Sequence, residues 1–241
     1  VLASQFESLA HPLTVITSGL NLLAHGNFNS SPETQTRLIQ QLESAGDNVL
    51  GLINDLLNVE KMEANEFELQ FTAVNTAVLL KNRIDDYQIL AATHKQTLQL
   101  EMPAQMPIVQ ADAELLSRVI DNLLANALKY TPEHGDVLVS AIVQPARLTL
   151  YFDDSGPGIP PDDRERIFEK FSQVRGSERR GAGLGLTFCR MVINAHSGHV
   201  EVNTSPLGGA RFAVHLPLQP TEPEANGPPA VSPDSLSNTP A

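Results

Sequence analysis

Asn122 and Asn126 lie one helical turn apart in an otherwise apolar stretch that runs to Tyr130. In a helix their carboxamides face the same side, with Lys129 on the adjoining edge. A carboxamide oxygen is a hard, neutral ligand suited to Mg²⁺ that carries the phosphates of a nucleotide, and a lysine supplies those phosphates with a point charge. A core helix with polar caps is the plainer interpretation, but it leaves two asparagines in a helix interior that they disfavour.

A second group of residues directly follows a predicted strand, where Asp154 precedes Gly156, Gly158 and Ile159. A buried carboxylate at a strand end can accept a hydrogen bond from an exocyclic amine such as N6 of adenine. Glycines let the backbone approach a flat ring closely. Taken alone, this pattern of an acid followed by two spaced glycines favours a plain turn.

Spaced glycines also lead into another predicted helix, directly after two arginines. This third group consists of Arg179, Arg180, Gly181, Gly183, Leu184, Gly185 and Leu186. Backbone N–H groups that glycines expose at a helix N-terminus can bind phosphate. A flexible linker is the alternative interpretation of this group.

In this order, the three groups resemble the nucleotide-binding boxes of sensor histidine kinases and of the wider gyrase, Hsp90, histidine kinase and MutL ATPase superfamily. The N, G1 and G2 boxes correspond to residues 122–131, 154–159 and 181–186. Residues 167–171 resemble the F box of the mobile ATP lid. The resemblance covers residues 1–217 and is that of a sensor histidine kinase transmitter core.

The resemblance implies that Asn126 coordinates Mg²⁺, that Asp154 reads adenine and that the lid glycines bind the phosphates of ATP. Tyr130 and Ile159 would line the base pocket. The other ATP-binding positions that it implies are Asn122, Lys129, Gly156, Gly158, Phe168, Arg179, Arg180, Leu184 and Leu186. The implied reaction moves the γ-phosphoryl group of Mg-ATP to a protein histidine and then to an aspartate of a response regulator receiver domain.

Hydrolases of the same superfamily carry a glutamate, which activates water, four residues before the Mg²⁺-binding asparagine. Asn122 stands at that position here, and a carboxamide cannot act as a general base. The sequence therefore favours phosphoryl transfer to a protein side chain over hydrolysis of ATP.

Residues 1–66 are predicted to form an antiparallel hairpin of two amphipathic helices, because apolar residues recur at three- and four-residue steps. One hairpin cannot cover both apolar stripes, so we expect a homodimer with a four-helix bundle. The alternative is that both helices pack on their own downstream domain.

Residues 67–218 are predicted to form an α/β sandwich in which helices cover one face of a mixed sheet. Strands are expected at 68–71, 97–101, 136–143, 147–153, 198–204 and 209–216, and helices at 76–94, 112–130 and 184–195. Residues 219–241 are rich in Pro, Ser and Asn, and we expect a disordered tail.

The first helix resembles a phosphoacceptor helix with an altered acceptor. The family signature His-Glu-x-x-Thr-Pro-Leu puts the phosphorylated histidine five residues before a proline, which here is Pro12. Glu7 occupies that histidine position, Ser8 replaces the acidic neighbour, and His11 replaces the Thr. The apolar frame around them is intact.

Several interpretations of this helix remain open. In the first interpretation, His11 acts as a shifted acceptor, one turn from Glu7, although Pro12 crowds it. Alternatively, the helix is degenerate, and the ATP domain phosphorylates another partner or serves as a nucleotide-gated pseudokinase scaffold. In a third interpretation Glu7 imitates the phosphorylated state, and in the plainest one both residues are merely exposed. We favour degeneracy.

The formal net charge of −12 argues against nucleic acid as a partner. The single cysteine excludes a disulfide framework and suits a reducing, cytoplasmic location. No apolar run is long enough to span a membrane. The chain opens inside a predicted helix, so we expect upstream sequence, in which any sensor or membrane anchor would lie.

Overall fold

The computed structural model describes residues 2–25, 34–43, 45, 46, 49, 51, 53, 68–172 and 183–218. In the first helix, side chains are described for residues 13–24. The predicted tail, Arg179, Arg180, Gly181 and the side chains of Glu7 and His11 therefore lie outside the described residues. So does much of the second helix of the predicted hairpin.

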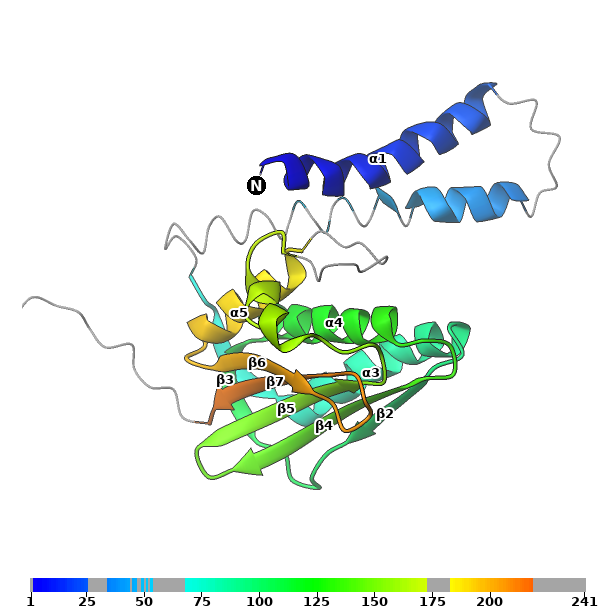
Figure 1. Cartoon of the computed structure of the whole chain (residues 1–241). Helices are drawn as coiled ribbons and strands as arrows, with labels where there is room; N and C mark the ends of the chain where they lie inside the picture. The colour runs from blue at the N-terminus through cyan, green and yellow to red at the C-terminus, as the bar shows by residue number, and fades with distance from the viewer. Residues whose placement is uncertain are drawn as a thin grey trace, which may run out of the picture.

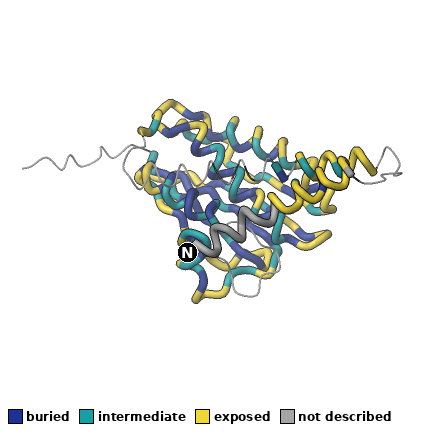
Figure 2. Tube along the Cα trace, turned by 90° about the horizontal axis from the view of Figure 1, so that it is seen from above, coloured by how far each residue is buried: buried dark blue, intermediate teal, exposed yellow. Residues whose placement is uncertain are grey.

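Two helical segments open the chain: α1, Leu2–His25, and residues 34–43. They lie side by side in Figure 1 and touch at a glycine. A Cβ atom built on Gly19 would lie 2.5 Å from Cδ2 of Leu42 and 3.4 Å from Cδ1 of Leu38. Figure 2 shows that the described part of α1 is mostly exposed.

Five strands form the mixed sheet that the sequence predicts. β2 (Thr97–Glu101) is parallel to β4 (Asp136–Gln144), and the other neighbouring pairs are antiparallel. The strands, in spatial order, are β2 (Thr97–Glu101), β4 (Asp136–Gln144), β5 (Arg147–Asp154), β7 (Ala210–Pro217) and β6 (His199–Thr204).

Three helices cover one face of this sheet (Figure 1): α3 (Thr76–Thr93), α4 (Ala113–Tyr130) and α5 (Gly185–Ala195). Short 3₁₀ turns, η1 (Pro161–Asp163) and η2 (Arg166–Phe168), precede α5.

Both ends of α4 are fixed by side chains. Asp112 Oδ1 accepts a hydrogen bond from the backbone N–H of Leu115 at 3.1 Å and so caps the first turn. At the other end, Gln96 Nε2 donates to the carbonyl oxygens of Leu128 and Thr131 at 2.9 and 2.7 Å. The helix stops before Pro132, because a residue that precedes proline disfavours helical geometry.

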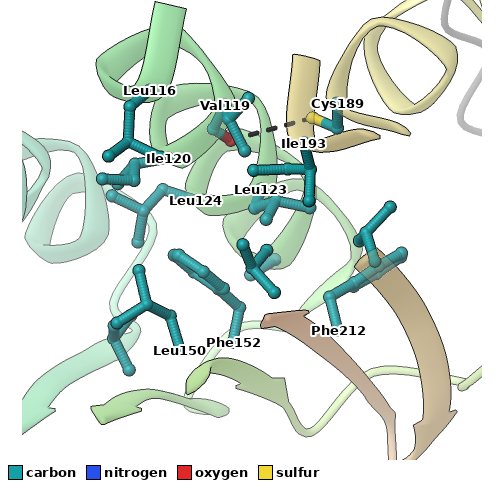
Figure 3. Packing of buried hydrophobic residues seen from close by; sticks show 14 of the residues in the cluster. Leu116, Val119, Ile120, Leu123, Leu124, Leu150, Phe152, Cys189, Ile193 and Phe212 are labelled. Atoms are coloured by element: carbon teal, nitrogen blue, oxygen red, sulfur yellow. Dashed lines mark hydrogen bonds between the residues drawn. The ribbon is translucent and has the colours of Figure 1, made fainter. Parts of the chain in front are cut away.

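The core lies between α4, α5 and the sheet (Figure 3). Leu150 and Phe152 of β5 point toward Leu123 and Leu124 of α4, and all four side chains are buried. Cys189 of α5 is buried as well, and its Sγ atom donates a hydrogen bond of 3.8 Å to the carbonyl oxygen of α4 Val119, drawn as a dashed line in Figure 3. This packing fixes α4 and α5 against each other and against the end of β5.

One part of the predicted order of elements is wrong. The first strand of this domain, β1, runs from Phe71 to Asn75 instead of 68–71, and it pairs antiparallel with a strand that the sequence did not predict, β3 (Ile108–Asp112). The pairing sets the position of β1, since Val74 and its partner Val109 are both buried. β3 begins directly after a proline and ends at the cap of α4, so its residues read as part of the turn and the helix start that flank them.

Candidate functional site

Asp154 ends β5 with its side chain buried, at 4% exposure. Its Oδ1 atom accepts hydrogen bonds from the backbone N–H groups of Gly156, at 2.8 Å, and Ala210, at 3.1 Å. Burial raises the pKa of this carboxyl group, while the two N–H groups act in the opposite direction. Among the described residues, none donates to Oδ2, so this oxygen can accept a hydrogen bond from a ligand.

The neighbouring Asp153 serves a different purpose, because successive side chains of a strand point to opposite faces. Its carboxylate is fully buried and accepts two hydrogen bonds from Arg211, both at 2.8 Å, and one from Ser205 Oγ at 2.8 Å. Asp153 is thus neutralised within the protein. Of the two acids that end β5, Asp154 is the candidate ligand-binding residue.

Glycines leave no room for other side chains around Asp154. A Cβ atom on Gly209 would overlap Asp154 Oδ1 and lie 2.5 Å from the Asp154 carbonyl oxygen, and a Cβ on Gly156 would lie 2.8 Å from the Tyr130 carbonyl oxygen. Gly158 has a φ of +72°, a left-handed conformation that favours glycine. Gly209 was not predicted as a site residue, although it belongs to a Gly-Gly pair directly before the last strand.

The N-terminus of α5 lies against α4 at the first of the two predicted asparagines. A Cβ atom on Gly185 would be 2.7 Å from Asn122 Oδ1. Asn126, one turn further along α4, is half-buried. No side chain among the described residues caps the start of α5, where Leu184 is the N-cap. Its first N–H groups can therefore bind an anion beside the asparagines.

The two ends of segment 173–182 meet at Gly183. The Phe171 N–H group donates to the Gly183 carbonyl oxygen at 2.9 Å, and a Cβ atom on Gly183, whose φ is +68°, would lie 2.8 Å from the Ser172 carbonyl oxygen. Residues 171–172 and 183 thus form a closed stem next to α5. Three predicted site residues, Arg179, Arg180 and Gly181, belong to the segment between them, outside the described residues.

Phe168, which the sequence analysis assigned to the site, lies in the core at 2% exposure. Its ring packs edge-on against Phe212 of β7, with centroids 6.3 Å apart, and the Arg190 guanidinium lies 5.4 Å from its centroid. The described contacts of Phe168 are with the protein. They anchor η2 to the sheet.

The remaining predicted residues lie at the C-terminal end of α4 or pack against the core. Lys129 Nζ lies 5.2 Å from the centroid of the half-buried Tyr130 ring. Ile159 and Leu186 pack partly buried against the core. Residues from all three sequence groups thus come together, since Tyr130 lies against Gly156 and α5 begins beside α4. The described residues contain no group of three or more His, Cys, Asp or Glu side chains that could hold a metal ion.

Comparison with known proteins agrees with this arrangement. Residues 111–220 match the family model of histidine kinase-, DNA gyrase B-, and HSP90-like ATPases. The alginate biosynthesis sensor protein KinB of Pseudomonas aeruginosa is 34% identical over 212 residues, which cover 88% of this chain and 36% of KinB. The adaptive-response sensory kinase SasA of Synechocystis sp. is 34% identical over 224 residues, which cover 90% of this chain and 58% of SasA.

Two solved structures are similar to different lengths of the chain. Full-length ShkA in complex with AMPPNP matches with a TM-score of 0.66 and 29% identity, over 88% of this chain and 45% of ShkA. The catalytic domain of the histidine kinase ThkA matches with a TM-score of 0.57 and 25% identity, over 62% of this chain and 98% of that domain. Helices long and apolar enough to cross a membrane are absent from the described part of the chain.

Proposed function

Since the chain carries an ATP-binding domain of the histidine kinase type, we propose that it is the transmitter core of a two-component sensor kinase. In this proposal it binds Mg-ATP, transfers the γ-phosphoryl group to a protein histidine and passes it on to a response regulator. The observation that carries the proposal is that three groups lie along the C-terminal half of α4: Asp154, the two asparagines and the start of α5. The chain spans 36% of the length of KinB and 58% of the length of SasA, so the proposal concerns this part of a sensor kinase and not its signal-sensing part.

The Asp154 carboxylate suits recognition of adenine. Oδ1 is occupied by Gly156 and Ala210, so Oδ2 remains to accept a hydrogen bond from the N6 amine of the base. Because Gly156 and Gly209 carry no side chain, the backbone packs directly against the Asp154 carboxylate and fixes it in position for the base. Phosphates extending from this point along α4 would reach Asn126 and then the uncapped N-terminus of α5.

The donor set along α4 also fits Mg²⁺ bound together with phosphates. Asn126 would hold it through its carboxamide oxygen, with phosphate oxygens and water completing the coordination, because Mg²⁺ prefers oxygen ligands and retains waters. When bound, Mg²⁺ would neutralise part of the negative charge on the phosphates. Lys129 adds a positive charge at the same edge of the helix.

Transfer requires an acceptor that reaches the γ-phosphorus from the side opposite ADP. At a histidine, an imidazole nitrogen forms the new N–P bond while the bond to the β,γ-bridging oxygen breaks, and ADP leaves with that electron pair. The imidazole then gives up its remaining N–H proton to solvent or a base. Hydrolysis is disfavoured, because Asn122 cannot activate water as a glutamate would.

Two observations support a dimeric hairpin that brings the acceptor to this domain. Leu13 and Leu20 of α1 are 47% and 54% exposed, so its apolar stripe needs a further partner. The similarity to ShkA covers 88% of this chain, whereas that to the ThkA catalytic domain covers 62%. Histidine kinase similarity thus extends beyond the ATP-binding domain. We propose that the partner is a second copy and that this core is cytoplasmic.

A second candidate function is a signalling scaffold that binds ATP without phosphorylating itself. It is favoured by Glu7, which stands where the family has its acceptor histidine, and by Ser8, which replaces the acidic neighbour. A carboxylate repels the triphosphate and forms at best a labile acyl phosphate. The two functions share the nucleotide site and differ only in the acceptor.

Labelling with [γ-³²P]ATP followed by acid treatment tests whether the acceptor lies in this chain or, as a degenerate helix implies, on a partner protein. We expect no label on the wild-type chain and acid-labile label on Glu7→His, because the substitution restores an imidazole at the usual position. His11→Gln is the control for the shifted acceptor. Acid-labile wild-type label that disappears in His11→Gln would make His11 the acceptor and refute degeneracy.

A further inference from the structure

His196, the residue after the last turn of α5, is buried and fully hydrogen-bonded. Its exposure is 5%. The backbone N–H group of Asp112 donates to Nε2 at 2.9 Å, and Nδ1 lies 2.7 Å from the carbonyl oxygen of Val192. The Phe71 ring packs edge-on against the imidazole, with centroids 5.3 Å apart. One side chain thus connects α5 with β1, β3 and the start of α4.

These two contacts allow a single protonation state. A backbone N–H group can only donate, so Nε2 must carry no proton and accept. The Val192 carbonyl can only accept, so Nδ1 must carry the proton and donate. A doubly protonated imidazole would point an N–H group at the Asp112 N–H group, and that hydrogen bond would be lost.

The surroundings offer the protonated ring little compensation. Burial lowers the pKa of His196, while the Val192 carbonyl and the charge of Asp112 raise it, and burial is the largest of these effects. Asp112 is the only charged group among the described residues that acts on the ring, since α5 presents a backbone carbonyl and β1 the uncharged Phe71. Both Asp112 oxygens are engaged, by the N–H groups of Leu115 and Gln70.

The position of His196 along the helices connects it with the nucleotide site. α4 begins at Asp112 and reaches Asn122 further along, whereas α5 begins at Gly185 beside Asn122 and ends before His196. The two helices therefore run in opposite directions, with His196–Asp112 joining one end of the pair and Gly185–Asn122 the other. A shift of α5 at His196 changes where its N-terminus meets α4.

We propose that neutral His196 is a positioning residue for the nucleotide site: it holds α5 against the start of α4, and its protonation releases α5 and weakens phosphate binding. The inference rests on the proposed function, because it takes the start of α5 as the phosphate site. It makes the affinity for nucleotide depend on the charge of a residue at the far end of α5.

Mg²⁺-dependent binding of a fluorescent ATP analogue, measured from about pH 8 to about pH 5, tests the proposal. The key variant is His196→Gln, whose carbonyl oxygen can accept from the Asp112 N–H group but does not titrate. The matched control is His215→Gln, since His215 is also a histidine with a lowered pKa but lies on β7. Protonation of Asp154 and of the nucleotide weakens binding in all three proteins, so the difference between the curves reports His196.

We expect wild type and His215→Gln to lose about tenfold more affinity over this range than His196→Gln, a typical size for coupling between two sites. Parallel curves for wild type and His196→Gln would overturn the inference while leaving ATP binding intact. Absence of binding at every pH would instead refute the proposed function.

Nitrogen NMR of the wild-type imidazole keeps the inference testable if His196→Gln does not fold. The expected spectrum at neutral pH is that of the Nδ1–H tautomer, and faster hydrogen exchange of the Asp112 amide should accompany protonation of the ring. An Nε2–H tautomer, or an Asp112 amide indifferent to the titration, would contradict it.

Discussion

Asp153 and Asp154 differ in their roles because their side chains point to opposite faces of β5. The sequence singled out Asp154, which precedes the spaced glycines, and the structure adds the physical reason: Asp153 is neutralised by Arg211, while one oxygen of Asp154 has no donor among the described residues. The Gly208-Gly209 pair is visible in the sequence, but the contact of Gly209 with Asp154 is not, because it depends on the pairing of β5 with β7.

Gly209→Ala should reduce ATP affinity by at least about tenfold, the loss expected when a buried hydrogen bond to the ligand is displaced. The added methyl group cannot coexist with the present position of the Asp154 carboxylate. Leu207→Ala, in the same turn but partly exposed, is the control and should bind ATP normally. Unchanged calorimetric affinity in Gly209→Ala would show that the Asp154 position is not critical.

At the scale of elements, α4 was the most predictable part of the chain and β3 the least. The boundaries of α4 follow from local signals, namely an Asp cap, an apolar stripe and a proline after its end. β3 has no such signals, because its five residues gain their structure from β1, far away in sequence. The same dependence on a distant partner explains the misplaced start of β1.

Phe168→Ala should destabilise the domain by about 3 to 5 kcal/mol, the usual cost of emptying a buried aromatic site. The ring packs on Phe212, so its loss frees η2 from the sheet. Urea unfolding measures the cost, and Phe168→Leu, which keeps most of the volume, should lose much less. If both variants unfold like wild type, Phe168 does not anchor η2.

At the scale of the whole molecule, the sequence predicts a homodimer, because one helical hairpin cannot form a four-helix bundle alone. The apolar residues of α1 that stay exposed belong to the stripe that motivated a four-helix bundle. The mixed sheet with helices on one face is confirmed, because each strand pattern was local and strong. The dimer stays a prediction, since it depends on contacts between two copies.

Leu20→Glu should convert a dimer into monomers without unfolding the ATP-binding domain. Leu20 is exposed in one chain, so the charge costs little there, but a bundle would bury it without a partner at a cost of several kcal/mol. Ser18→Glu, exposed on another side of α1, is the matched control and should remain dimeric. Light scattering that finds a monomeric wild type would exclude the bundle.

Isothermal calorimetry of Mg-ATP binding to wild type and Asp154→Asn tests the central claim most directly. The asparagine can keep an oxygen toward Gly156 and Ala210, but it replaces Oδ2 with an N–H donor that opposes the N6 amine of adenine. We predict binding by wild type and a loss of about 1 to 3 kcal/mol in the variant, with unchanged thermal stability as evidence of an intact fold. Equal affinity in the two proteins would contradict the assignment of this pocket to ATP.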